Sequence, residues 1–278
     1  MNTDGITTHL RELDELGYTV LKDLLTPHQV SEAVAALKEI YEREKDIAQV
    51  LEPMTQPTFN VTRRAEIFRQ LIQLPKLVAC MEYLLGKDYI LSDMSARSPM
   101  PGIKGQNLHR DGGIFLRTPE GDPNPHAVLP ISAQSMFALV EFTEGNGATR
   151  FVPRSHVVNI DPTKVRPDEE YLFTCPPGSV LVYDNRLIHG GGPNTTDQVR
   201  YSLQGFCCRS NIRPFCDHTR SIPRDIVENA SPLMRRLWGF ESQSMWEGDT
   251  PRRFKIVEAP GAKPVFDYHP VVHCQTKR

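Results

Sequence analysis

The sequence predicts an all-β core with helices: a double-stranded β-helix, or jelly-roll and cupin-like barrel, flanked by N-terminal and C-terminal α-helices. Three observations favour it. Before residue 87 the apolar residues recur at helical spacing, and after it short runs of strand-forming residues alternate with turn residues. Many short strands at this spacing are typical of a barrel or jelly roll. Near the end of the chain, residues 223–240 return to helical spacing.

Residues 1–86 are expected to form a mainly helical support. Gly17 ends the first helix, and Gly86 ends the last one. Thr26, Pro27 and Gln29 are a helix start, with Thr26 as N-cap, proline in the first turn and glutamine closing a capping box. The expected elements are a helix over 9–15, a strand over 18–21, a helix from 27, a loop over 48–60 and helices over 65–73 and 75–85.

Residues 87–212 are expected to form the jelly-roll core. Glycine- and proline-containing turns separate its segments, as short connections between strands require. The expected strands cover 89–98, 106–111, 131–143, 148–153, 179–184 and 199–208. Residues 213–278 are expected to add a helix over 223–240 and an extended tail. We expect these three parts to make one domain spanning 1–278.

Composition argues against several classes of function. Of 278 residues 39% are hydrophobic, and the formal net charge of −2 comes from acids and bases mixed along the chain. We therefore expect no nucleic acid and no membrane as partner, and a cytoplasmic location. The six cysteines form no Cys-x-x-Cys pair, so we expect reduced thiols and neither a zinc site nor a disulfide framework.

The most informative pattern is His109-Arg110-Asp111 followed by His189. Residues i and i+2 of a strand point to the same side, so His109 and Asp111 face one way. Two imidazoles and one carboxylate hold non-haem Fe(II) on one face and leave the other face open. On its own His-x-Asp is a weak signal. The glycine turn after it and the distant histidine before three glycines strengthen it.

Arg200 follows His189 by eleven residues, on an expected strand. It shares one face of that strand with Ser202, Gln204 and Phe206. A buried arginine needs a carboxylate partner, and a guanidinium can hold the far carboxylate of a diacid by a bidentate fork. With the two histidines and the aspartate, Arg200 predicts an oxygenase that uses Fe(II), O2 and 2-oxoglutarate.

Motifs over most of the chain resemble the phytanoyl-CoA dioxygenase family of Fe(II)/2-oxoglutarate oxygenases. The opening, residues 13–26, resembles that family's start. Phe-Thr-Glu-Gly-Asn-Gly-Ala-Thr at 142–149, with Pro-Arg-Ser-His at 153–156, resembles its central motif. Pro-Gly-Ser-Val-Leu-Val-Tyr-Asp at 177–184, leading to His-Gly-Gly-Gly-Pro-Asn at 189–194, resembles its distal-histidine segment. Residues 222–228 are similar to the members that act in secondary metabolism.

The resemblance implies roles for six residues. It implies that His109, Asp111 and His189 are the iron ligands, and that Gln106, Thr149 and Arg200 contact 2-oxoglutarate. Two features depart from the family. Arg154 replaces the usual glycine of Pro-Gly-Ser-His, and the proline-rich segment 117–130 has no recognisable counterpart.

The function expected from these residues is oxidation of an unactivated C–H bond of a small molecule in the biosynthesis of a natural product. Hydroxylation, desaturation and rearrangement all remain open, and so does a homodimer. Halogenation is not expected, because Asp111 fills the place that chloride would need. Alternatives are the same chemistry on an acyl-CoA or a polar primary metabolite, a non-catalytic barrel that keeps the metal, and a Jumonji-type protein hydroxylase. The sequence has no lysine-rich cluster that would bind the phosphates of CoA, which argues against an acyl-CoA substrate. The intact ligand set together with Arg200 argues against a non-catalytic barrel. Jumonji-type hydroxylases typically use a lysine for the C5-carboxylate, and this chain has Arg200 in that role.

Other residues have simpler interpretations. His156 is expected to fix a loop by hydrogen bonding, and residues 216–218, Cys-Asp-His, to be a plain loop. His269 and His273 are not expected to bind metal. Four aromatic residues are expected in the core and not on a substrate cavity, namely Phe115, Phe137, Trp238 and Trp246.

Overall fold

The computed structural model describes residues 3–51, 55–111, 129–158, 160–240, 246–247 and 250–251. The α-helices in these ranges are α1 (Thr3–Leu16), α2 (Pro27–Leu51), α3 (Glu66–Ile72), α4 (Pro75–Leu85), α5 (His218–Ser221), α6 (Arg224–Asn229) and α7 (Pro232–Leu237). The strands are β1 (Tyr18–Leu21), β2 (Thr55–Thr58), β3 (Ile90–Pro99), β4 (Ser132–Ala138), β5 (Thr149–Phe151), β6 (Tyr171–Leu172), β7 (Val180–Asp184), β8 (His189–Gly191), β9 (Ser202–Cys208), β10 (Trp246–Glu247) and β11 (Thr250–Pro251). Among the described helices, none has the length and apolar character needed to cross a bilayer.

Two antiparallel sheets build the core. The larger has the order β1-β7-β4-β9-β3-β2, and the smaller has the order β6-β5-β8. An isolated bridge joins His109 to His189, so the chain around His109 extends the smaller sheet beyond β8. Sequentially distant strands are therefore neighbours, as in the jelly roll that the sequence predicts.

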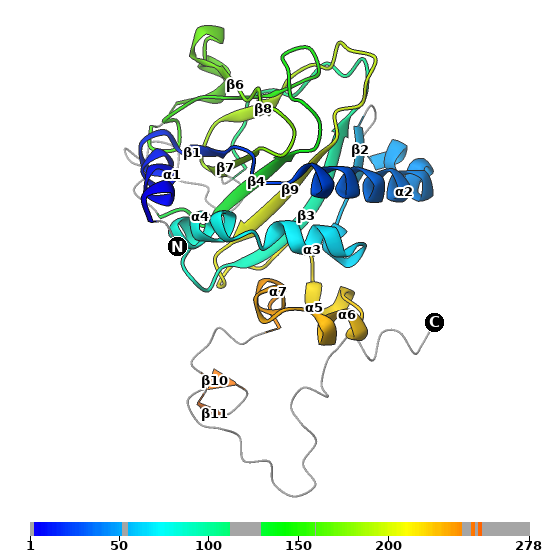
Figure 1. The fold of residues 1–278 in the computed structure, drawn as a ribbon. Helices are drawn as coiled ribbons and strands as arrows, with labels where there is room; N and C mark the ends of the chain where they lie inside the picture. The colour runs from blue at the N-terminus through cyan, green and yellow to red at the C-terminus, as the bar shows by residue number, and fades with distance from the viewer. Residues whose placement is uncertain are drawn as a thin grey trace, which may run out of the picture.

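The outer face of the large sheet packs against helices. Because side chains alternate along a strand, Met94 and Ala96 of β3 share this face with Phe137 of β4 and Leu203 of β9. They form one apolar cluster with the buried residues of α2, α3 and α4. These helices lie along one side of the large sheet, and β6 and β8 lie toward the opposite side (Figure 1). Each large side chain fully buried here contributes about 1.5–3 kcal/mol.

The inner face of the large sheet faces the small sheet. At one end it is apolar, and Met136, Leu181 and Tyr183 pack with Phe142 and Phe151 in a second cluster. Toward β9 and β3 the inward positions become polar, and these side chains line a cavity. The sandwich is thus closed by packing at one end and left open for a ligand at the other.

Several local predictions are confirmed. The backbone N–H of Thr26 donates to Gln29 Oε1 at 2.9 Å and the N–H of Gln29 donates to Thr26 Oγ1 at 3.2 Å, which is the predicted capping box. Gly17 adopts a φ of +84°, and a Cβ there would lie 2.5 Å from Nδ1 of His156. Phe137 and Trp238 are core residues, as expected. The five cysteines in the described part of the chain are free thiols, four of them buried.

Other local predictions were wrong. Residues 48–60 are not a loop, because α2 continues to Leu51 and β2 follows. The stretch 223–240 is not one helix, since Pro232 cannot continue the hydrogen-bond ladder and Ser231 caps a new helix through Met234 N–H at 2.9 Å. The stretch 106–111 makes one bridge and no full strand, and 131–143 is a strand only over β4. Phe115, the side chain of Trp246, residues 117–128, and the tail with His269, His273 and Cys274 lie outside the described residues.

Candidate metal centre and its cavity

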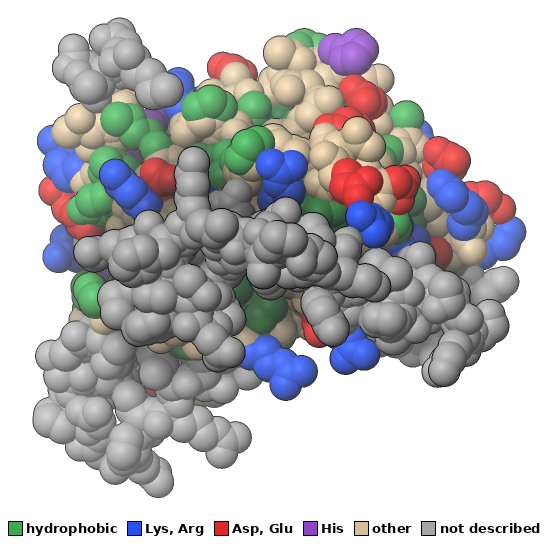
Figure 2. All heavy atoms as spheres, turned by 90° about the horizontal axis from the view of Figure 1, so that it is seen from below, with side chains coloured by type: hydrophobic (Ala, Val, Ile, Leu, Met, Phe, Trp, Pro, Cys, Tyr) green, Lys and Arg blue, Asp and Glu red, His purple; other side chains and the backbone are tan. Residues whose placement is uncertain are grey.

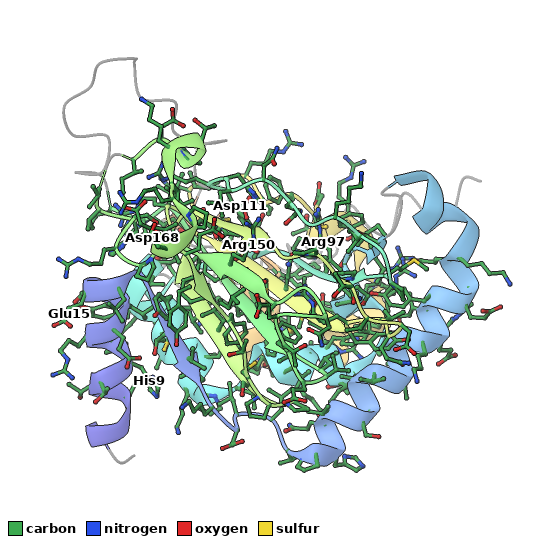
Figure 3. The ribbon with its side chains drawn as sticks, turned by 90° about the horizontal axis from the view of Figure 1, so that it is seen from above. His9, Glu15, Arg97, Asp111, Arg150 and Asp168 are labelled. Carbon is green, nitrogen blue, oxygen red and sulfur yellow. The ribbon has the colours of Figure 1, made fainter. Side chains whose placement is uncertain are left out.

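Three side chains with metal-binding groups meet between the two sheets. Asp111 Oδ1 lies 3.5 Å from His109 Nε2, and Asp111 Oδ2 lies 3.4 Å from His189 Nε2. One ligand atom from each residue lies within 4.8 Å of the other two. Figure 3 shows Asp111 above the middle of the strands, with His9 and Glu15 far away on α1. The structure thus brings together residues that are 80 positions apart in the chain, as the sequence pattern requires.

Hydrogen bonds to the backbone set the orientation of both imidazoles. His109 Nδ1 lies 2.8 Å from the carbonyl oxygen of Asn107, and His189 Nδ1 lies 3.1 Å from that of Leu187. A carbonyl can only accept, so each Nδ1 carries the hydrogen and each Nε2 keeps its lone pair. Both lone pairs are then available on the side of Asp111. This is the tautomer that a metal-binding histidine needs.

Asp111 is held as a carboxylate. Gln134 on β4 donates from Nε2 to Asp111 Oδ2. Burial raises the pKa of Asp111, but its contacts with His189, His109 and Gln134 outweigh burial and leave the pKa below its ordinary value. Our sequence interpretation missed Gln134. The sequence does contain a signal for it, because the alternation of side chains along β4 places the polar Gln134 on the face that lines the cavity.

The backbone joins the two histidine segments directly. His109 N–H donates to the carbonyl of His189 at 2.8 Å, and His189 N–H donates back to the carbonyl of His109 at 2.9 Å. Gly190 permits this approach, because a Cβ there would lie 3.0 Å from the carbonyl oxygen of Asn107. Gly192 permits a second close approach, since a Cβ there would lie 2.7 Å from the carbonyl oxygen of Ala148. The run of three glycines after His189 is therefore a packing requirement of the site.

Arg110 does not line the cavity, and its side chain contacts the backbone behind the metal-binding residues. Its guanidinium donates to four backbone carbonyls, those of Arg186 at 2.9 Å, Ile160 at 2.7 Å, Ser155 at 3.2 Å and Val158 at 3.1 Å. Arg186 lies three residues before His189. Arg110 thus ties the loop 155–160 and the approach to His189 onto the segment that carries His109 and Asp111.

Arg200 lies just before β9 and not on it, yet its side chain reaches the cavity. It is 3% exposed, donates to the carbonyl of Gly147 and stacks 4.5 Å from the ring centre of Phe142. Its Nε has no hydrogen-bond partner, and within the described ranges no carboxylate pairs with it. Burial lowers the pKa of Arg200 to about 10, so the group still carries its charge at neutral pH. A buried cation without an anion is costly, which makes this a place for an anionic ligand.

Gln106 and Thr149 lie on the same cavity wall. Gln106 Oε1 accepts from Gly191 N–H at 3.0 Å, and Arg150 donates to the carbonyl of Gln106 at 2.6 Å. Thr149 is buried in β5, and its hydroxyl lies 3.2 Å from Sδ of Met136. Gln106 is thus partly used in joining its segment to β8.

The cavity between the sheets measures about 540 Å³, within the usual range for a small-molecule site. Its wall contains all six residues that the sequence singled out, His109, Asp111, His189, Gln106, Thr149 and Arg200. The remaining wall comes mainly from β3, β9 and the chain beside them. Asp111, Arg97 and Arg150 lie over the same part of the molecule in Figure 3.

Three further features that the sequence singled out have structural outcomes. His156 Nε2 lies 3.1 Å from the carbonyl oxygen of Asp14, so it fixes a loop as predicted. Arg154 has a φ of +66°, a left-handed conformation that explains why a glycine suits this position. In the segment 216–218, Asp217 caps the short helix α5 through Arg220 N–H, so that segment is not simply a loop.

Comparison with known proteins agrees with this geometry. Residues 13–202 match the family described as phytanoyl-CoA dioxygenase (PhyH). Dioxygenase trt7 of Aspergillus terreus is 30% identical over 239 residues, which cover 83% of this chain and 82% of that protein. Dioxygenase cdmA of Talaromyces verruculosus is 34% identical over 159 residues, covering 56% of this chain and 52% of that protein.

Solved structures share the fold. The epimerase SnoN in complex with Fe3+, alpha ketoglutarate and nogalamycin RO has a TM-score of 0.59 at 18% identity, covering 83% of this chain and 94% of that one. HygX from Streptomyces hygroscopicus, with nickel and 2-oxoglutarate bound, has a TM-score of 0.58 at 13% identity, covering 74% and 88%. At these identities the likeness concerns the fold, and it confirms the predicted jelly-roll class.

Proposed function

The chain belongs to the phytanoyl-CoA dioxygenase (PhyH) family, and from this premise we propose that it is an Fe(II)- and 2-oxoglutarate-dependent dioxygenase acting on a small molecule. His109, Asp111 and His189 hold the ferrous ion. Arg200 binds the C5-carboxylate of 2-oxoglutarate, and Gln106 and Thr149 line the space between Arg200 and the metal.

One observation carries the proposal: the same cavity holds a converging His-Asp-His set and a buried guanidinium with no described counter-anion. Two imidazoles and a carboxylate on one face suit non-haem Fe(II) and leave positions open for other ligands. Arg200 fits a carboxylate, because its orphaned Nε gains an acceptor and its charge gains a partner. A site that bound metal alone would have no use for Arg200.

When bound together, Fe(II), 2-oxoglutarate and O2 supply the oxidising power for attack on an unactivated C–H bond, with release of succinate and CO2. The protein's part is to hold and orient. Gln134 keeps Asp111 ionised and in place, while the carbonyls of Asn107 and Leu187 fix the two imidazoles. The apolar cluster around Phe142 and Phe151 closes the sandwich behind the site and keeps water out on that side.

The substrate is a small molecule, and we place it in natural-product biosynthesis. SnoN and SnoK, which share the fold, are described as a non-haem epimerase and carbocyclase from nogalamycin biosynthesis. On the face seen in Figure 2, basic and acidic side chains are interspersed among the described residues, which is not the footprint of a nucleic-acid site. We also propose a cytoplasmic location.

The test is an anaerobic titration with Fe(II) and then 2-oxoglutarate, recorded by visible absorption. The wild-type protein should develop the weak charge-transfer band of a ferrous 2-oxoglutarate chelate. His109→Ala should abolish the band, and His28→Ala, an exposed histidine on α2, should keep it. A folded, iron-loaded wild-type protein that shows no band would contradict the proposal.

A second arm tests Arg200. Arg200→Ala should weaken 2-oxoglutarate binding by about ten- to a hundred-fold, because charge-assisted bonds are worth about 1.5–3 kcal/mol. Iron binding should be kept. The exposed Arg213 is the matched control, and Arg213→Ala should change neither affinity. Unchanged 2-oxoglutarate affinity in Arg200→Ala would remove Arg200 from the proposed role.

A further inference from the structure

The end of the cavity away from Arg200 contains a second buried charge, Asp93 of β3. It is 6% exposed and lines the cavity wall. Its Oδ1 accepts from the N–H of Asn60 at 2.9 Å and from Sγ of Cys216 at 3.1 Å. Ser95 also hydrogen-bonds to this carboxyl. All these donors are neutral.

No cation balances Asp93 within the described part of the chain. None of the ion pairs found there includes it. Arg97, four residues further along β3, makes interactions of its own and no ion pair with Asp93. Burial raises the pKa of Asp93, because none of the described neighbours supplies a positive charge that would offset the cost of ionising it.

Aromatic side chains gather around this carboxyl. Phe206 is the register partner of Asp93 across β3 and β9, so the two side chains stand side by side on the cavity face. The rings of Phe206 and Phe215 have centroids 4.9 Å apart, and Phe215 directly precedes Cys216. Phe59 directly precedes Asn60, and Phe59 and Phe215 are 42% and 54% exposed on the cavity wall. A carboxylate among aromatic rings is the combination that recognises a substituted ammonium group.

The sheet register gives the distance from this group to Gln134, the residue that bonds Asp111 of the metal centre. Tyr183, Gln134, Phe206 and Asp93 form one row across β7, β4, β9 and β3. Asp93 lies two strands from Gln134, roughly 10 Å at about 4.8 Å per strand, and the Gln134 side chain bonds Asp111. That is the span of a bicyclic or tricyclic ring system.

We propose that Asp93, with Phe59, Phe206 and Phe215, is a substrate subsite for a protonated amine, and that the substrate is an amine-bearing ring compound with its oxidised carbon roughly 10 Å from the nitrogen. This rests on the proposed function, since it names the substrate class of the same cavity. The competing case is a substrate whose neutral hydroxyl group hydrogen-bonds to Asp93, and the experiment separates the two.

The experiment is calorimetric titration of the full-length, metal-free protein at neutral pH with three probes of one shape. Tryptamine carries an ammonium group, tryptophol a hydroxyl in its place, and indole-3-propionate a carboxylate. Tryptamine should bind about ten-fold more tightly than tryptophol, and indole-3-propionate more weakly than both, because a desolvated ammonium gains from both the carboxylate and the rings. Equal affinities for tryptamine and tryptophol in the wild-type protein would overturn the proposal.

Variants locate the binding. Asp93→Asn should remove the preference for tryptamine over tryptophol, while Asp88→Asn, an exposed carboxylate bonded to Ser210, should leave it intact. Phe206→Leu should weaken tryptamine more than tryptophol, and this variant serves if Asp93→Asn does not fold. An unchanged preference in whichever variant folds would place the amine elsewhere and overturn the subsite. The charge-transfer titration on the same protein separates the two proposals: a normal band without amine preference refutes only the subsite, and amine preference without a band refutes only the dioxygenase.

Discussion

Arg110 stands between two proposed metal ligands yet acts on the backbone behind them. We predict that Arg110→Gln loosens the metal centre without removing a ligand. The wild-type guanidinium joins loop 155–160 and the carbonyl of Arg186 to the segment of His109 and Asp111. Glutamine carries both of its N–H donors on one nitrogen at the end of a shorter side chain, so it cannot span the four carbonyls, and we expect it to keep one of the four bonds.

The size of the effect follows from those bonds. Bonds from a charged donor are worth about 1.5–3 kcal/mol when buried, but Arg110 is half-buried and water can reach the abandoned carbonyls. We therefore take about 1 kcal/mol for each of three lost bonds, or about 3 kcal/mol in the free energy of unfolding. Metal affinity should fall about ten- to a hundred-fold, as is usual when support of metal ligands is removed.

The assay has two readouts. Urea denaturation gives the free energy of unfolding, and competition with a chromophoric chelator for Co(II) gives metal affinity. Arg213→Gln, at an exposed arginine, is the control and should leave both unchanged. Arg110→Lys should be intermediate in metal affinity, because it keeps the charge and loses the planar fork. Wild-type metal affinity in a folded Arg110→Gln protein would refute the positioning role.

Three other variants test neighbouring parts of the structure. Gln134→Leu removes the donor to Asp111, and competition titration should show metal affinity lowered about ten-fold. Gly192→Ala puts a Cβ 2.7 Å from the carbonyl of Ala148, and the free energy of unfolding should fall by about 1–3 kcal/mol in urea. Burial lowers the pKa of His218 to about 4, below its ordinary 6.5, so the unfolded state binds the extra proton between these pH values and stability falls as pH falls. The free energy of unfolding should therefore drop by about 3 kcal/mol from pH 7 to pH 4, and His218→Gln should lack this drop.

Each of these has a control. Gln204→Leu changes an amide on the same cavity wall, and equal loss of metal affinity there would contradict the special role of Gln134. Gly5→Ala places its Cβ in open space on α1 and should not destabilise, so a similar loss in both glycine variants would argue against the clash. If wild type and His218→Gln share one pH dependence, another group titrates in place of His218.

Local sequence determined much of the fold. The capping box at Thr26, the helix over 75–85 and the strand over 179–184 each depend on neighbours a few positions away, and each formed as predicted, as α4 and β7 show. The types of residue needed for the site were also readable, because Fe(II) and a diacid require particular side chains. Predictions failed where a short pattern was compatible with two structures. Residues around Pro232 could belong to one long helix or to the start of a second helix, and the structure has the second arrangement.

The tertiary structure alone decided which distant groups meet. The backbone bridge between His109 and His189, the Gln134 bond to Asp111 and the direction of Arg110 all join segments that packing brings together, and no local pattern encodes their distance. The same holds for Asp93. Only the sheet register shows that its described neighbours are aromatic residues such as Phe206 and that none of them is a cation paired with it. Side-chain chemistry is a property of the chain, whereas burial and partnership are properties of the packed sheets, and a buried group's behaviour depends on both.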